Sequence, residues 1–151
     1  RGLVGSEMCI RDSPCSDMTI MVQKEVGQRM VASEVDKEYS SLSVFIRFYT
    51  EAKTLVNLPK SVFMPQPKID STILNLKLRI YDKNVDQETL FKLVRAGFNK
   101  RRKTILNSMS DVVDKEDLKV AFEKTGLKAN LRAENLSIDD YINLANELTK
   151  Q

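Results

Sequence analysis

The pattern of apolar residues changes at residues 81–86, and this change limits the folds that the chain can adopt. Before it, short apolar runs typical of strands alternate with segments whose apolar residues recur at helical spacings of three and four. After it, only the helical spacing occurs. The 151-residue chain is therefore predicted to form a strand–helix unit over residues 17–80 and a small helical domain over residues 87–151.

In the first unit we expect strands over residues 18–22, 54–58 and 70–79, and helices over residues 26–32 and 41–49. Strands and helices without hairpin turns are typical of the trailing part of a larger α/β sheet of the Rossmann-like, doubly wound kind. In such a sheet the opening strand would have no partner within this chain. The five glycines contain no G-x-G-x-G pattern, so we expect no cofactor cradle here.

Residues 1–16 form a segment that matches nothing downstream. Residues 8–13 resemble the translation of a sequencing adaptor, and a natural flexible tail is the alternative. The only two cysteines, Cys9 and Cys15, lie in this segment without another soft metal ligand, so we predict neither a zinc site nor a disulfide. We treat residues 1–16 as a non-native tail and expect a reducing, cytoplasmic setting.

Histidine is absent from the chain, which excludes Ser-His and Cys-His nucleophile pairs and the commonest zinc ligand. We therefore expect no metal site. No segment approaches the roughly 20 apolar residues that a membrane-spanning helix needs, so we expect no membrane role. The net charge of +3 is too small to indicate a polyanionic partner by itself.

A cluster of basic residues lies within a predicted long amphipathic helix from Glu88 to Met109. On a helix, one face would carry Lys92, Arg95, Asn99, Arg102 and Lys103. Arg101 would project from the apolar side and is expected to anchor a contact between domains. The candidate RNA-binding residues are Lys92, Arg95, Lys100, Arg102 and Lys103. A solvated surface is the alternative, and charge clustering alone favours it.

Phe63 stands beside Pro65 and Pro67 in a segment that the prolines keep stiff and extended. A rigid aromatic ring can serve as a platform on which a base stacks. The alternative is a phenylalanine that fills the core beside a strand, and without further context that alternative is favoured.

Gln23 and Glu25 follow the first strand, at the position where α/β folds commonly bind ligands. Glu25 could equally interact with the dipole of the helix that follows. Both interpretations stay open.

Several segments, in their order and spacing, resemble the bacterial ribosomal RNA adenine dimethyltransferases. They are Met21-Val22-Gln23-Lys24-Glu25-Val26, the run Phe-Met-Pro-Gln-Pro-Lys-Ile-Asp-Ser from Phe63, the run from Phe98 to Asn107, and Leu-Arg-Ala-Glu-Asn-Leu-Ser from Leu131. The resemblance implies a Rossmann-like domain that binds S-adenosylmethionine, followed by a helical RNA-binding domain. It implies that Phe63 stacks on a flipped target adenine and that the partner is small-subunit ribosomal RNA in a pre-30S particle. We expect a monomer.

Two departures from the family follow from the same resemblance. The donor-binding motifs and the family's Asn-Leu-Pro-Tyr motif should precede Thr19, so this chain is expected to be an inactive fragment. Asn57-Leu58-Pro59 is similar to that motif, but it follows the first strand and Lys60 replaces the aromatic residue, so we assign it no role.

Two other functions stay open. One is a large-subunit ribosomal RNA adenine methylase of the macrolide-resistance type, although the segment from Arg132 to Ser137 favours the small-subunit group. The other is a noncatalytic RNA-binding or assembly module.

Overall fold

A computed structural model describes residues 16–150 and divides the chain into two compact units. The first contains the residues up to Val31 together with Phe45–Tyr81, and the second contains Ala32–Val44 and the residues from Asp82 onward. Residues 32–44, expected in the strand–helix unit, thus group with the C-terminal helices. The predicted tail lies outside the described residues apart from Ser16, and Cys9 and Cys15 lie outside them entirely.

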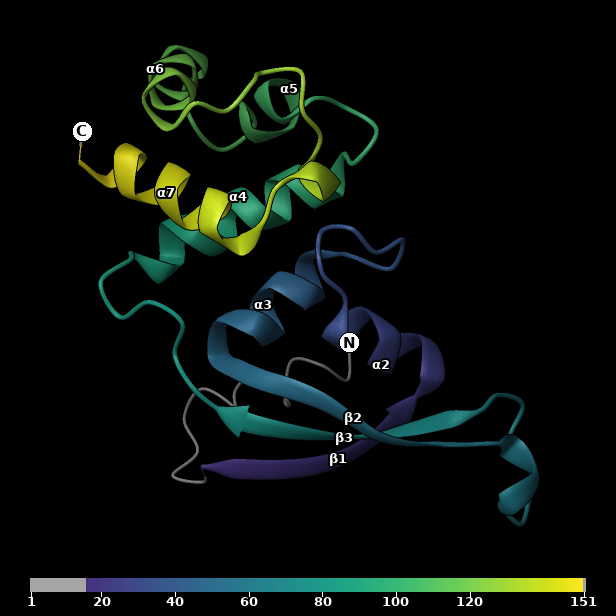
Figure 1. The fold of residues 1–151 in the computed structure, drawn as a ribbon. Coiled ribbons are helices and arrows are strands. Elements are labelled where there is room, and N and C mark those ends of the chain that lie inside the picture. The colour runs from purple at the N-terminus through teal and green to yellow at the C-terminus, as the bar shows by residue number, and fades with distance from the viewer. Residues whose placement is uncertain (1–15, 151) are drawn as a thin grey trace. The chain divides into compact units, whose positions relative to one another are not determined.

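The first unit is built on a three-stranded sheet in the order β1-β3-β2 (Figure 1). Its strands are β1 (Asp17–Gln23), β2 (Thr50–Leu58) and β3 (Ser71–Leu78), and β3 runs antiparallel to both neighbours. The prediction that the opening strand has no partner in the chain is wrong, because β1 pairs with β3 along its whole length. The returning strand lies between the two parallel ones and satisfies backbone groups on both sides.

Helices α2 (Lys24–Val31) and α3 (Ser41–Tyr49) connect β1 to β2 and lie over the same face of the sheet (Figure 1). On that face β3 buries Thr72, Leu74 and Leu76. A Cβ atom at Gly27 of α2 would lie 2.2 Å from Cγ2 of Thr72, so only glycine permits this close approach. Among residues 16–150, no helix of the first unit covers the opposite face, and apolar side chains such as Met21 are exposed there.

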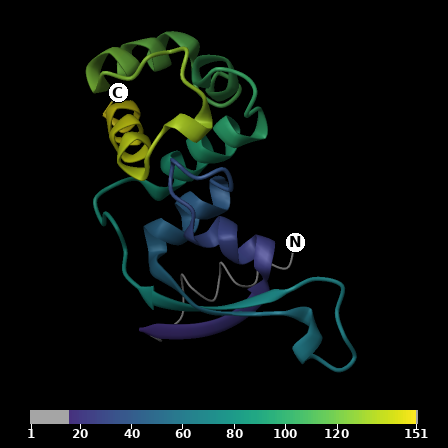
Figure 2. The same cartoon turned by 45° about the vertical axis from the view of Figure 1, so that its right-hand side comes forward.

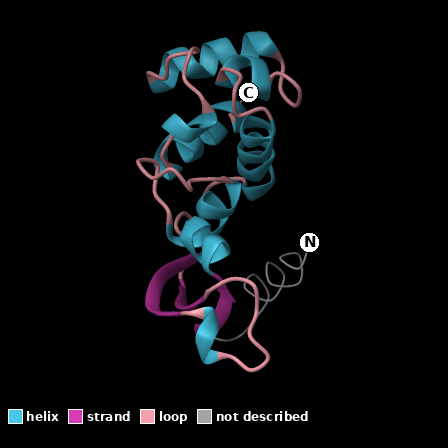
Figure 3. Cartoon of the chain, turned by 90° about the vertical axis from the view of Figure 1, so that its right-hand side faces the viewer, coloured by secondary structure: helices cyan, strands magenta, loops and turns pink. Residues whose placement is uncertain are grey.

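The second unit contains helices and loops, and its described residues include no strand (Figure 3). Its elements are α4 (Gln87–Asn99), α5 (Ile105–Met109), α6 (Lys115–Thr125), η2 (Ala133–Asn135) and α7 (Ile138–Thr149). Two predicted helix starts are confirmed. Asp114 accepts a hydrogen bond from Glu116 N–H, and Ser137 forms a capping box with Asp140. Gly126 ends α6 with a left-handed φ of 78°.

The predicted single helix from Glu88 to Met109 is wrong, because the helix stops at Asn99 and a new one starts at Ile105. Thr104 explains the break: its side chain caps α5 by accepting a hydrogen bond from Asn107 N–H at 3.4 Å. Continuing the helix would also bring Lys100 and Lys103, three residues apart, next to each other as a like-charge pair.

Two buried tyrosines tie η2 and the segment after it into the core of the second unit. The Tyr141 hydroxyl donates to the carbonyl of Ala133 at 2.7 Å, and the Tyr39 hydroxyl donates to the carbonyl of Leu136 at 2.8 Å. Burial, followed by the nearby Tyr39 and Asp140, raises the pKa of Tyr141 well above its ordinary value. The Tyr141 phenol therefore stays protonated in the folded protein at a pH where it ionises in the unfolded chain.

This difference in pKa predicts a loss of stability in alkali. Below about pH 10 the contribution of Tyr141 is fully present, and it falls by up to about 1.4 kcal/mol per pH unit as the pH rises further. Tyr141→Phe should abolish this part of the pH dependence. It should also cost about 1–3 kcal/mol near neutral pH, because the Ala133 carbonyl loses its donor. Urea unfolding followed by circular dichroism measures both effects. Tyr81→Phe, at an exposed tyrosine, is the control, and equal pH dependence in the wild type and Tyr141→Phe would contradict the assignment.

Candidate functional site

The loop of residues 59–70 projects beyond the ends of β2 and β3 (Figure 2). It opens with the short helix η1 (Lys60–Val62), and Phe63 follows at once, its N–H donating to the carbonyl of Lys60 at 3.3 Å. Phe63 is half-buried, whereas the neighbouring Met64 is 97% exposed. The ring thus lies outside the fully buried core, and part of it is open to a ligand.

Asp70 holds both ends of this loop. Its carboxylate accepts a hydrogen bond from the backbone N–H of Lys60 at 2.9 Å, which closes the loop across ten residues. Its carbonyl accepts from the backbone N–H of Lys24 at 3.0 Å, which joins the loop to the start of α2. The backbone that carries Phe63 therefore lies between two fixed points.

A hollow of about 500 Å³ lies beside this loop. Three lysines and two acidic residues line it, namely Lys24, Lys60, Lys68, Glu25 and Asp70. Gln28 and Ile69 complete the lining. The formal net charge of the lining is therefore +1, and the Asp70 carboxylate already accepts a hydrogen bond from the backbone. Phe63 is not among the residues that line the hollow, although Lys60 and Lys68 belong to the same loop. The hollow therefore suits an anionic group beside the loop that carries Phe63.

Sequence reasoning missed the three lysines of this hollow. Lys60 and Lys68 flank the proline segment, and this was the available signal; Lys24 reaches the hollow only through folding. Glu25, selected from the sequence, lines the hollow and stands in the first turn of α2, where it pairs with Arg29 at 3.0 Å. Gln23 ends β1 and is exposed, outside the residues that line the hollow.

The five cations selected from the sequence lie on a helix and the turn after it instead of on one helix. Lys92 and Arg95 are exposed on α4, and Lys100, Arg102 and Lys103 occupy the turn between α4 and α5. Lys100 pairs with Asp111 at 2.7 Å. Within residues 16–150, neither Arg102 nor Lys103 has a side-chain partner, so both are available to an external anion.

Arg101 has a different environment from its neighbours. Its guanidinium donates to the carbonyl of Tyr39 at 3.2 Å, lies 3.8 Å from Glu134 and stands 5.8 Å from the centre of the Phe98 ring. All three partners belong to the second unit, although Arg101 was expected to bridge two domains. Arg101 thus stabilises this unit from within.

The glycines of the described segment supply no cradle for a nucleotide-like cofactor. Gly27 packs against Thr72, Gly97 is buried in α4, and Gly126 ends α6. Residues 16–150 therefore do not fit S-adenosylmethionine by themselves. Over the same residues, no cluster of three or more candidate metal ligands occurs. None of the helices described combines the length and the apolar character needed to cross a membrane.

Comparison with known proteins gives a consistent result. The family model described as ribosomal RNA adenine dimethylase matches residues 8–150, a match that begins within the predicted tail. Ribosomal RNA small subunit methyltransferase A of Oceanobacillus iheyensis is 38% identical over 144 residues, which cover 91% of this chain and 49% of that protein. The protein of the same name from Alkaliphilus oremlandii is 41% identical over 143 residues, covering 91% and 50%. The chain thus spans about half the length of these relatives.

Two solved structures share the fold. A dimethyladenosine transferase from Plasmodium falciparum aligns with a TM-score of 0.79 at 24% identity, covering 95% of this chain and 61% of that one. The 23S rRNA methyltransferase ErmE aligns with a TM-score of 0.67 at 18% identity, covering 98% and 62%. The predicted α/β class is confirmed, with part of a Rossmann-like methyltransferase sheet preceding a helical unit. The chain belongs to the ribosomal RNA adenine dimethylase family.

Proposed function

We propose that this chain forms the substrate-binding part of an enzyme that dimethylates adjacent adenines at N6 in small-subunit ribosomal RNA. S-adenosylmethionine would be the methyl donor and a pre-30S particle the substrate. The observation that carries the proposal is the half-buried Phe63 on its tied loop, in a chain 38–41% identical to proteins named small subunit methyltransferase A. The monomeric state, the absence of a metal and the cytoplasmic setting stay predictions.

Phe63 would hold the target adenine by stacking. Taking a base out of its stack costs a few kcal/mol, and one base–aromatic stack returns about 1–3 kcal/mol. The exocyclic nitrogen of adenine is a weak nucleophile because its lone pair is delocalised into the ring. Correct placement of that nitrogen can therefore supply much of the rate, and a ring on a loop tied by Asp70 would supply that placement.

The basic residues would hold the RNA backbone. Lys24, Lys60 and Lys68 line the hollow beside Phe63, where the phosphates next to a stacked base would lie. In the second unit, we assign Lys92, Arg95, Lys100, Arg102 and Lys103 to backbone contacts. Arg102 and Lys103 are the strongest candidates, because Lys100 already pairs with Asp111. Such contacts give affinity that is independent of RNA sequence.

The main alternative is methylation of large-subunit ribosomal RNA. The likeness to the 23S enzyme is one of fold only, at 18% identity, whereas the relatives at 38–41% identity favour the small subunit. Primer extension on both ribosomal RNAs from a strain lacking the gene separates the two. Missing marks in the small-subunit RNA are expected. Loss of a large-subunit mark alone would overturn the proposal, and unchanged marks in both RNAs would favour a noncatalytic module.

Replacing Phe63 tests the stacking role in the whole gene product. Phe63→Leu keeps most of the apolar volume but loses the aromatic plane, so methylation should fall roughly 5–150-fold, as expected for a lost stack of about 1–3 kcal/mol. Phe63→Tyr should retain most activity. Mass spectrometry of ribosomal RNA fragments measures the dimethyladenosine, and thermal melting should show a small shift because the side chain is half-buried. Equal activity in Phe63→Leu and the wild type would refute the role.

Replacing Asp70 tests the positioning of the loop. Asp70→Ala removes the acceptor for Lys60 N–H, a hydrogen bond worth about 1 kcal/mol, so exchange of the Lys60 amide hydrogen should quicken about five-fold. Methylation should also fall in Asp70→Ala, because the loop that carries Phe63 is less firmly held. Asp70→Asn keeps an oxygen acceptor, so both the slow exchange and the methylation should stay close to those of the wild type. Unchanged exchange in Asp70→Ala would show that the loop is held by other contacts.

Neutralising the turn between α4 and α5 tests the backbone contacts. The double variant Arg102→Gln, Lys103→Gln should make the plot of log affinity for RNA against log salt concentration less steep. Its slope should fall by about 0.7–0.9 for each phosphate that is no longer bound. The control is Lys119→Gln, Lys124→Gln, which removes the same charge from exposed positions of α6. Binding is measured by fluorescence anisotropy across a salt series. An equal effect in both double variants would make the turn ordinary basic surface.

A further inference from the structure

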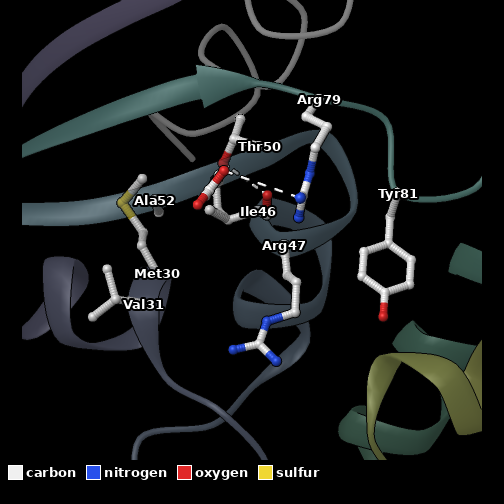
Figure 4. Close-up of a pocket in the computed structure, with 9 residues that line it drawn as sticks. Met30, Val31, Ile46, Arg47, Thr50, Ala52, Arg79 and Tyr81 are labelled. Carbon is white, nitrogen blue, oxygen red and sulfur yellow. Dashed lines mark hydrogen bonds and ion pairs between the residues drawn. The ribbon is translucent and has the colours of Figure 1, made fainter.

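A second hollow, of about 250 Å³, lies at the end of the sheet opposite to the loop of residues 59–70. Figure 4 shows the residues that line it. It forms where β2 begins, at Thr50, and where the chain leaves β3, at Arg79. The nine-residue strand β2 separates it from the Phe63 loop by roughly 25–30 Å. The two hollows are therefore different sites within the first unit.

Two arginines from different elements line this hollow. Arg79 follows β3 and extends toward α3, and Arg47 projects from α3 (Figure 4). A guanidinium carries five N–H donors in a planar fork, which matches the geometry of phosphate oxygens. Both forks border one hollow, but the Arg47 guanidinium extends away from Arg79 (Figure 4). A phosphate held by both therefore requires the Arg47 side chain to turn toward Arg79.

The positive charge of this hollow is only partly neutralised. Glu51 is the one acidic residue lining it, and its carboxylate lies 4.0 Å from the guanidinium of Arg79, with both side chains more than half exposed. Such a pair is worth little, so Arg79 can turn to an anion. Arg47 is half-buried, and no hydrogen bond or ion pair engages its guanidinium within residues 16–150.

The remaining walls strengthen the attraction for an anion. Met30 and Ile46 are at most 4% exposed and contribute an apolar lining. This lining lowers the local dielectric constant and strengthens charge interactions. Tyr81 stands at one side and is 38% exposed (Figure 4). The volume is below that of usual pockets for drug-sized ligands, about 300–1,000 Å³, and suits a phosphate with its sugar.

We propose that Arg47 and Arg79 form a phosphate-binding site, with the attached sugar against Tyr81. An RNA strand, which the proposed function supplies, is the source that we favour. At this distance from Phe63 the phosphate would belong to a nucleotide other than the target adenine. The site would add affinity and orientation without touching the base that reacts.

Arginine side-chain NMR signals test the site directly. The Nε–H signals of Arg47 and Arg79 are followed while the protein is titrated with a uridine oligoribonucleotide or with inorganic phosphate. Both signals should shift and saturate together with the oligomer. Saturation with inorganic phosphate at equal affinity would also support phosphate binding and would identify the free anion as its source. No saturable shift with either probe would overturn the proposal.

Variants make the assignment specific. Arg79→Gln should weaken the affinity for the oligoribonucleotide, as measured from the Arg47 Nε–H signal, roughly ten-fold. This is the effect of losing a charged hydrogen bond. Glu51→Gln removes the competing carboxylate and should tighten binding, a gain that misfolding cannot produce. Lys124→Gln, at an exposed position of α6 outside the hollow, is the control and should leave affinity unchanged. Weaker binding in Glu51→Gln, or equal losses in Arg79→Gln and Lys124→Gln, would contradict the site.

These measurements use no methyl donor and no adenine. Failure of the arginine signals to respond would therefore remove the phosphate site and leave the proposed methylation untouched. Conversely, ribosomal RNA that keeps all its marks in a strain lacking the gene would remove the proposed enzyme without removing a phosphate site.

Discussion

The first unit depends on the insertion of β3 between β1 and β2. Each strand in this unit is held through β3, since β1 and β2 make no ladder with one another in the described sheet. One end of the ladder pairs Ser71 with Gln23 and Leu58, which brings Asp70 against the start of α2 and the loop of Phe63. The other end pairs Leu78 with Thr50, which places Arg79 beside α3. Both candidate sites are therefore consequences of one register.

The two ends of this ladder offer different chemistry. At one end a loop tied by Asp70 carries an aromatic ring and borders a hollow lined by three lysines, which suits a base and its neighbouring phosphates. At the other end two arginines line a partly apolar hollow, which suits a phosphate with its sugar. A strand of RNA presents bases and phosphates at different distances along its length, so a sheet with both kinds of site can orient it.

Buried polar contacts add to the apolar packing that organises the second unit. The hydroxyls of Tyr39 and Tyr141 satisfy carbonyls around η2, and Arg101 adds a donor to the carbonyl of Tyr39. These contacts divide the basic run of residues 100–103 into different roles. Arg101 faces the protein, Lys100 pairs with Asp111, and the next two cations face solvent. A run of like charges is thus no guide to which of its members bind RNA.

The sequence by itself determined the features that rest on neighbouring residues: the caps at Asp114 and Ser137, the end of α6 at Gly126, the alternation of β3 and the stiff proline loop. It also carried the family resemblance, because motif order needs no coordinates. Capping and alternation depend on bonds and spacing within a few residues, so local patterns predict them.

Only the tertiary structure decided the partner of β1, the break before α5, the lysines of the hollow beside the Phe63 loop, and the presence of Arg47 and Arg79 at one hollow. The break shows the limit most clearly. The apolar spacing of residues 88–109 suits one helix, yet Ile105 N–H donates to the carbonyl of Leu131, 26 residues away in the chain, and Thr104 caps the new helix. Contacts between distant residues depend on how the elements pack, and periodicity along the chain carries no information about that packing.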